Sequence, residues 1–189
     1  MPMPYSRAMK YLVALAALCA LGSAHGATLD ECSTLFHQIH IAYDAKDWKN
    51  GEKLAERSVK VCSSAASAFP YFVSMSYSFL GNIQEQQSKW NAALKTADAC
   101  IQLYYANAGC HNIRWVALGG LSRVKEGANE FIITRSVAQS TLSTEPTPSD
   151  NALYKAYLAK AKEEATSILA ETSPEAMRAQ GLLPPAKAP

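Results

Sequence analysis

The sequence predicts an all-α protein built from stacked antiparallel helix hairpins. Apolar residues recur at helical spacing along almost the whole chain, whereas β-branched residues are scattered and do not alternate as they would in a strand. Short polar runs and Gly or Pro residues interrupt this pattern at intervals that suit ordinary helices. The 189 residues, 49% of them apolar, are enough for one folded domain.

Residues 1–26 are typical of a secretory signal peptide. Arg7 and Lys10 supply positive charge, an apolar run of eleven residues follows over 11–21, and small residues precede a cleavage point after Gly26. Eleven apolar residues are fewer than the roughly 20 that a membrane-spanning helix needs. We therefore expect a periplasmic or secreted protein with no stable membrane span.

Removing the predicted leader changes the charge and cysteine counts. Of the 189 residues, 163 remain. They include 16 basic and 16 acidic residues, so the net charge of +2 belongs entirely to the leader. A neutral chain gives no support for nucleic acid as a partner. Four of the five cysteines remain, and an even number in an exported chain predicts a disulfide framework. Met9 followed by Lys10 would itself be a normal start, so residues 1–8 could lie outside the natural precursor.

Helical periodicity predicts six helices in the first part of the chain. Asp30 can cap the first, and Pro70 lies in the first turn of the third, where its missing N–H costs little. The third helix is apolar around much of its surface, so we expect it at the centre of the fold. The predicted ranges are about 30–45, 48–61, 70–83, 90–104, 113–118 and 128–142.

The character of the chain changes after residue 143. Residues 144–150 cannot be helical across both of their prolines, so we expect a linker there. Ser149 or Asp150 caps a long seventh helix with one apolar stripe and one charged side, as expected of a helix that caps a stack. With a short last helix it forms C-terminal capping helices over 151–181, followed by a disordered tail at 182–189.

Two tryptophans introduce matching patterns. Small residues follow Trp48 and Trp90 at the same spacings, three and seven positions on. Aromatic-x-x-Leu-Gly patterns occur at 77–81 and 115–119. Residues 30–142 therefore resemble the tetratricopeptide repeat family, in which small residues let paired helices approach closely. The interval from Trp48 to Trp90 is longer than the family's period of roughly 34 residues, so an unrelated helical bundle remains the alternative.

The resemblance implies a right-handed superhelix whose first helices line a concave groove for peptides. Transferred by position, the groove residues are Tyr43, Met75, Ser78, Asn82, Gln86, Val116, Gly120 and Arg123, with Phe36 and Ile39 less securely placed. Asn82 could pair with a ligand backbone and Arg123 with a carboxylate. The alternative is that these residues are solvated or covered by the C-terminal helix.

The predicted hairpins indicate which cysteines pair. Cys32 and Cys62 lie at equal distances along the chain on either side of the turn at Asp47, so they meet at the open end of an antiparallel hairpin. Cys100 and Cys110 flank the connector between the predicted fourth and fifth helices, which brings them together. Of the three connectivities that four cysteines allow, we therefore expect Cys32–Cys62 and Cys100–Cys110.

Candidate chemistry is limited to one helix face. His37, His40 and Asp44 share that face and could hold zinc or copper, although a polar face with two neutral histidines is the simpler interpretation. The sequence contains no nucleophile elbow, zinc-protease motif, phosphate loop or calcium loop, so we expect neither an enzyme nor a cofactor. Glu163 and Glu164 are expected on a solvated face.

These observations predict an exported, non-catalytic scaffold that binds another protein or a peptide, such as an assembly adaptor in the bacterial envelope. An immunity or inhibitor protein that blocks a toxic enzyme in the periplasm is one alternative. A metal-binding helical protein is the other. The sequence identifies neither the partner nor the oligomeric state.

Overall fold

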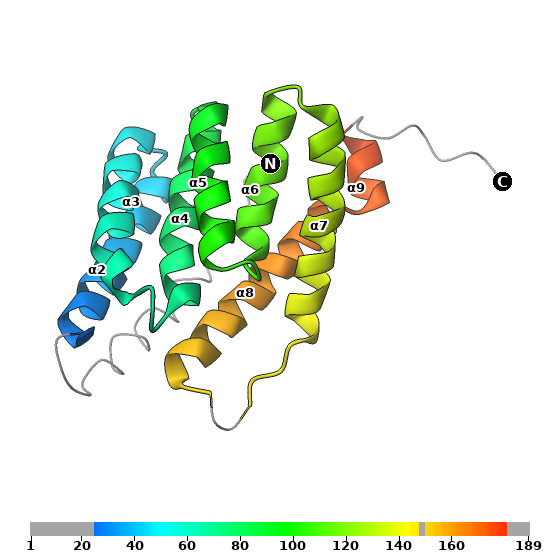
Figure 1. Ribbon diagram of the computed structural model, residues 1–189. Coiled ribbons are helices and arrows are strands. Elements are labelled where there is room, and N and C mark those ends of the chain that lie inside the picture. The colour runs from blue at the N-terminus through cyan, green and yellow to red at the C-terminus, as the bar shows by residue number, and fades with distance from the viewer. Residues whose placement is uncertain (1–24, 148–149, 181–189) are drawn as a thin grey trace.

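The computed structural model describes residues 25–147 and 150–180, and all regular structure within these ranges is helical (Figure 1). The all-α class is therefore confirmed for the described part. Nearly all of the predicted signal peptide and the whole of the predicted tail lie outside it. The helices are α2 (His25–Asp44), α3 (Trp48–Cys62), η2 (Ser63–Ala65), α4 (Pro70–Gln86), α5 (Trp90–Leu103), α6 (Ala108–Gly120), α7 (Val124–Ser143), α8 (Ala152–Glu171) and α9 (Pro174–Ala179).

Three hairpins, α2–α3, α4–α5 and α6–α7, are closed by the same turn. Lys46, Ser88 and Ser122 each adopt a left-handed backbone, with φ of 55°, 56° and 59°. The residue after each one donates its N–H to a carbonyl five residues earlier, as in a Schellman motif. These bonds are Asp47 to Ala42 (2.8 Å), Lys89 to Gln84 (2.9 Å) and Arg123 to Leu118 (2.9 Å). The interval from Ser88 to Ser122 is shorter than the interval from Lys46 to Ser88.

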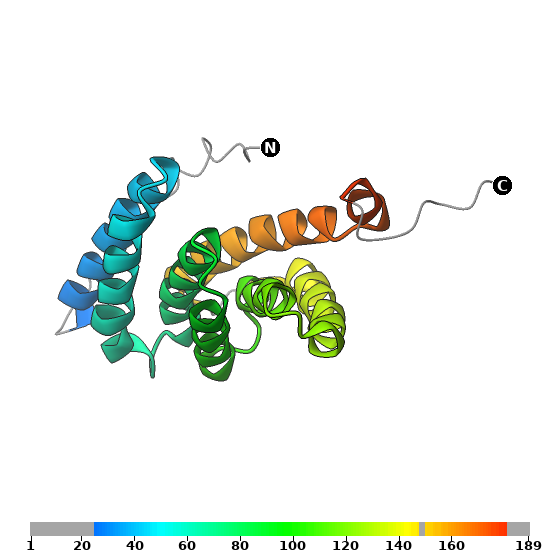
Figure 2. The same ribbon diagram turned by 90° about the horizontal axis from the view of Figure 1, so that it is seen from above.

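The hairpins stack side by side, and α8 runs across the stack. Each helix from α2 to α8 packs against the next one in the chain (Figure 1). Figure 2 shows α8 lying along the side of α4 and α6 that faces away from α5, and α8 packs against α4, α6 and α7. The C-terminal helix therefore covers part of the face that the first helices of the hairpins present.

The main core lies between α2, α3, α4 and α8. Ile39 and Ile83 are fully buried there, and the rings of Phe36 and Phe72 lie 5.1 Å apart. A smaller apolar cluster joins α5 to α6, and a third joins α7 to α8. Gly81 lets α4 and α6 approach closely, because a Cβ at this position would lie 2.9 Å from the side chain of Ile113.

Several helix starts differ from the sequence prediction. Helix α2 begins at His25, so Asp30 lies inside it and does not cap it. Helix α6 begins at Ala108, five residues before the expected start, because the Asn107 side chain caps it there. Helix α7 begins at Val124, four residues before the expected start, because the turn at Ser122 leads directly into it. Helix α8 is capped by neither Ser149 nor Asp150. Asn151 accepts from the Tyr154 N–H at 2.7 Å, while the Asp150 carboxylate closes the linker turn by accepting from the Thr147 N–H at 2.6 Å.

Both predicted disulfides are present. Cys32–Cys62 joins α2 to the end of α3 with the Cα atoms 5.8 Å apart, and Cys100–Cys110 joins α5 to α6 with the Cα atoms 6.0 Å apart. Among the described helices, none has both the length and the apolar character needed to cross a membrane.

Candidate binding pocket

A cavity of about 410 Å³ opens between the α5–α6 connector, α7 and the N-terminal half of α8. Four tyrosines line it, two from the connector and two from α8: Tyr104, Tyr105, Tyr154 and Tyr157. Helix α7 adds aliphatic and hydroxyl side chains. None of the described residues that line the cavity is charged. Its volume lies within the range of about 300–1,000 Å³ typical of ligand pockets, and its lining suits an uncharged apolar or aromatic group.

The inner wall is a cluster of tyrosine rings. The ring of Tyr71, from α4, lies 5.2 Å from Tyr154 and 5.2 Å from Tyr157, and Tyr104 meets Tyr157 edge-on at 5.8 Å. The Tyr71 hydroxyl donates to the Asn151 side chain at 3.2 Å. Burial raises the pKa of Tyr157, so its phenol stays neutral. The cluster ties the start of α8 to α4 and presents an uncharged aromatic surface.

The mouth of the cavity carries exposed apolar side chains. Tyr105 is 60% exposed and Ile132 is 66% exposed, and they are two of the four large apolar side chains that are exposed in the described part of the chain. Ser136 and Ser140 lie one helical turn apart on the same wall, and their hydroxyls have no partner among the described residues. An incoming group would meet apolar rings first and free hydroxyl donors beside them.

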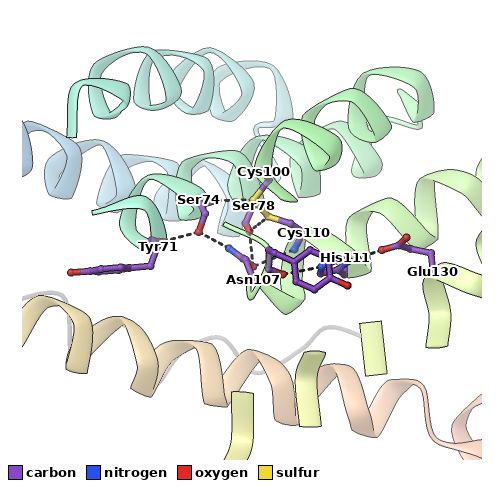
Figure 3. Close-up of a disulfide and its surroundings, with 9 residues drawn as sticks. Tyr71, Ser74, Ser78, Cys100, Asn107, Cys110, His111 and Glu130 are labelled. Atoms are coloured by element: carbon purple, nitrogen blue, oxygen red, sulfur yellow. Dashed lines mark hydrogen bonds and ion pairs between the residues drawn. A yellow bond between two sulfur atoms is a disulfide. The ribbon is translucent and has the colours of Figure 1, made fainter. Parts of the chain in front are cut away.

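The connector wall is fixed by polar contacts around the second disulfide (Figure 3). The Asn107 amide donates to the Ser74 hydroxyl at 2.9 Å, and Ser74 donates to the Tyr71 carbonyl at 2.7 Å. The Asn107 oxygen accepts from the Cys110 N–H at 3.2 Å and so caps α6. The Ser78 hydroxyl lies 3.2 Å from the Cys110 sulfur. These contacts hold residues 104–107 against α4.

A buried carboxyl group, that of Glu130, ties the same wall to α7. His111 Nδ1 lies 2.6 Å from Glu130, and Nε2 donates to the Tyr105 carbonyl at 2.9 Å. Arg114 pairs with the other Glu130 oxygen and, at 2.7 Å, with Asp98. Burial acts to raise the pKa of Glu130, but hydrogen bonds from His111 and Arg114 outweigh it and hold this pKa below its ordinary value.

No protein-family model, no curated protein and no solved structure matches this chain. The arrangement of the chain's own side chains is therefore the basis for inferring its function.

Four of the predicted groove residues pack inside the protein or against its side chains. Ser78 is 8% exposed and belongs to the polar contacts around the disulfide. Met75 packs against the main core, and Tyr43 meets the Trp48 ring edge-on at 5.1 Å. Gly120 lies under the Trp90 ring, which a Cβ there would overlap. Phe36 and Ile39, the two groove residues whose placement is less secure, are core residues.

The other predicted groove residues lie nearer the surface. Gln86 is exposed, Asn82 and Val116 are half-buried, and Arg123 forms two hydrogen bonds to Glu126, at 2.7 and 2.5 Å. None of the eight lines the cavity. The groove interpretation and the cavity are therefore two separate surfaces.

One carboxyl group beside the predicted groove has an unusual environment. Burial raises the pKa of Glu85 to about 8, and one of its carboxyl oxygens is buried with no hydrogen-bond partner among the described residues. It lies close enough to Tyr43 to raise the pKa of that phenol as well, although burial of Tyr43 is the larger cause. Glu85 is therefore largely protonated at neutral pH.

The weak metal candidate does not form a ligand cluster. The His40 ring stands edge-on to Phe79 at 4.7 Å, and burial lowers its pKa, with Lys160 adding to the effect. His37 is exposed. In the ranges that the structure describes, no three His, Cys, Asp or Glu side chains are grouped to hold a metal ion.

Sequence reasoning missed the residues of the cavity and misplaced Glu164. Aromatic and aliphatic side chains most often lie in a core, so residue type gives no sign of a cavity here. The pair Tyr104-Tyr105 at a helix break is a local signal. Glu164 is not on a solvated face, because its carboxylate lies directly against Gly109 in the first turn of α6, and burial raises its pKa. Both features depend on how α8 docks, which local patterns do not encode.

Proposed function

We propose that this chain is an exported, non-catalytic binding protein that captures a segment of another protein in the tyrosine-lined cavity. The observation that carries the proposal is an uncharged aromatic cavity with Tyr105 and Ile132 exposed at its mouth. Aromatic anchors in desolvated pockets dominate the energy of protein recognition. An apolar or aromatic side chain of the partner would enter the cavity, and its backbone would accept from Ser136 and Ser140.

The fixed connector wall supports a binding role. Its disulfide, its capping asparagine and the buried contact between His111 and Glu130 all restrain residues 104–107 before any partner arrives. A site that is already ordered loses less conformational entropy on binding. The contacts that stabilise this region therefore also favour tight binding at the cavity.

The repeated turn supports the view that the scaffold is of the tetratricopeptide kind. Three hairpins close with a left-handed residue and the same backbone hydrogen bond. The interval from Ser88 to Ser122 equals the family's period of about 34 residues. The right-handed superhelix and the family relationship are part of this proposal. The two disulfides support export, because such bonds persist in oxidising compartments such as the periplasm.

A peptide-library selection on the immobilised protein tests the proposal, with the affinity of selected peptides measured by calorimetry. We expect peptides rich in aromatic and aliphatic residues. The variant Ile132→Lys places a charge at the mouth and should weaken binding by about 10-fold or more, equivalent to about 1.4 kcal/mol. Ile41→Lys is the matched control, since Ile41 is a 57% exposed isoleucine on α2, away from the cavity. Equal losses in both variants, or selected peptides dominated by charge, would contradict the proposal.

A further inference from the structure

The cavity sets clear requirements for its occupant. Its described lining carries no charge, so a charged segment would lose hydration without gaining an ion pair. The tyrosine rings favour flat or branched apolar groups, and the free hydroxyls of Ser136 and Ser140 call for acceptors beside them. A short apolar stretch with exposed backbone carbonyls meets both requirements.

The chain itself contains such a stretch just after α9. Residues 182–185 read Leu-Leu-Pro-Pro, are uncharged and apolar, and lie outside the described residues. Prolines favour the extended polyproline conformation, in which backbone carbonyls have no internal partner. Aromatic-lined grooves recognise proline-containing segments of this kind because little entropy is lost on binding.

The position of the stretch favours the cavity of a second copy over the cavity of its own chain. The cavity is lined by Tyr154, Tyr157 and Leu158 near the start of α8, whereas α9 lies beyond the other end of that helix (Figure 2). Leu158, the last residue of α8 that lines the cavity, is 13 residues before Glu171, or about 20 Å along the helix. Leu183 is three residues beyond Gln180, a reach of about 10 Å.

We propose that residues 182–185 of one copy of this chain occupy the tyrosine-lined cavity of a second copy. Exchange in both directions gives a symmetric dimer with two identical contacts. Once one contact forms, the second becomes intramolecular, so two weak contacts give a stable pair. The inference rests on the peptide-binding role proposed above and adds a specific occupant, which would cover the exposed Tyr105 and Ile132.

The mass of the protein in solution tests the exchange. The exported chain should sediment as a dimer at micromolar concentration, and the same chain ending at Gln180 should sediment as a monomer. Leu182→Asp/Leu183→Asp and Ile132→Lys should also give monomers, whereas Ile41→Lys should leave the dimer intact. Circular dichroism should show the same helicity in every variant, because the changes lie on the surface or outside the described residues. An unchanged mass after truncation at Gln180 would overturn the inference.

A synthetic peptide of residues 180–187 provides a second test of the inference. It should bind the truncated chain in calorimetry, and binding should be lost with Ile132→Lys or when both leucines of the peptide are replaced by aspartate. If this peptide fails to bind while library peptides bind the cavity, the inference fails and the proposed function stands. If neither binds, the cavity is not a peptide site and both fail.

Discussion

The two disulfides are the same covalent bond in different surroundings. Cys32–Cys62 closes the α2–α3 hairpin within the apolar main core, where the Ser58 hydroxyl is the polar group in contact with it. Cys100–Cys110 lies between two sets of polar contacts, one that joins Asn107 to Ser74 and one that joins His111 to Glu130 (Figure 3). The first bond links two helices within the main core, whereas the second lies among polar contacts beside the cavity.

Loop length alone does not separate the two disulfides. Their sequence separations are 30 and 10 residues. The chain-entropy model then gives about 3.6 and about 2.7 kcal/mol of stabilisation, a difference of about 1 kcal/mol. Each buried polar group that loses its partner costs about 1–3 kcal/mol. The polar surroundings therefore distinguish the second region more than the bond does, and they place the connector that forms the cavity wall.

The largest expected effect comes from removing the carboxylate at the centre of the second region. Glu130→Ala leaves His111 and Arg114 without their buried partner, which should cost about 3–5 kcal/mol in the free energy of unfolding. It should also release the Tyr105 wall and weaken peptide binding. Urea denaturation measures the stability. Asp98→Ala, which removes the exposed partner of Arg114, is the control and should cost less than about 1 kcal/mol.

The same carboxylate should make the free energy of unfolding depend on pH in the acid range. Because the pKa of Glu130 is held below its ordinary value in the folded protein, its contribution is present at neutral pH and is lost as the pH falls through that lowered pKa. The free energy of unfolding should therefore fall below about pH 4.5 in the wild type. In Glu130→Ala this part of the acid dependence should be missing, and an identical pH profile would count against the assigned role.

Removing each disulfide in turn distinguishes its effect on stability from its effect on peptide binding. Cys32→Ala/Cys62→Ala should lower the free energy of unfolding by about 3.6 kcal/mol and Cys100→Ala/Cys110→Ala by about 2.7 kcal/mol. Only the second variant should weaken peptide binding, because only that bond holds the cavity wall. Calorimetric titration of both variants measures this. Equal losses of affinity would show that the two regions do not differ in the way described.

The smallest effect concerns Glu85, a buried carboxyl without the partners that Glu130 has. Its pKa is raised to about 8, so the folded protein retains a proton that the unfolded chain releases above its ordinary carboxyl pKa. Stability should therefore decline as the pH rises from about 4.5 to 8. Glu85→Gln should raise the free energy of unfolding by about 1–2 kcal/mol at pH 8, less than the whole pKa shift implies, because Glu85 is only partly buried. It should have little effect at pH 4, and a uniform effect at both pH values would rule out this cause.

Local sequence patterns predict most of the fold. The features that they miss depend mainly on how α8 docks against the other helices. Helical periodicity predicts each long helix, although α2 and α6 both begin five residues before their predicted starts. Equal distances from a turn are enough to pair Cys32 with Cys62, and positions on either side of a connector are enough to pair Cys100 with Cys110. The start of α7 was misplaced because Ser122 adopts the left-handed turn without a glycine to signal it. The cavity was not predicted because its walls come from three segments, 104–106, 132–144 and 154–158, which meet only when α8 docks.

Isoleucine methyl spectra can locate binding directly, because isoleucines are distributed over both regions. Ile132 and Ile133 line the cavity, Ile39 and Ile83 lie in the main core, and Ile41 is exposed on α2. Titrating the isotope-labelled, truncated chain with the residue 180–187 peptide, or with a selected library peptide, should shift the signals of Ile132 and Ile133 and leave those of Ile39, Ile41 and Ile83 in place. Shifts at Ile39, Ile41 or Ile83 without shifts at Ile132 and Ile133 would place recognition away from the cavity and contradict the account.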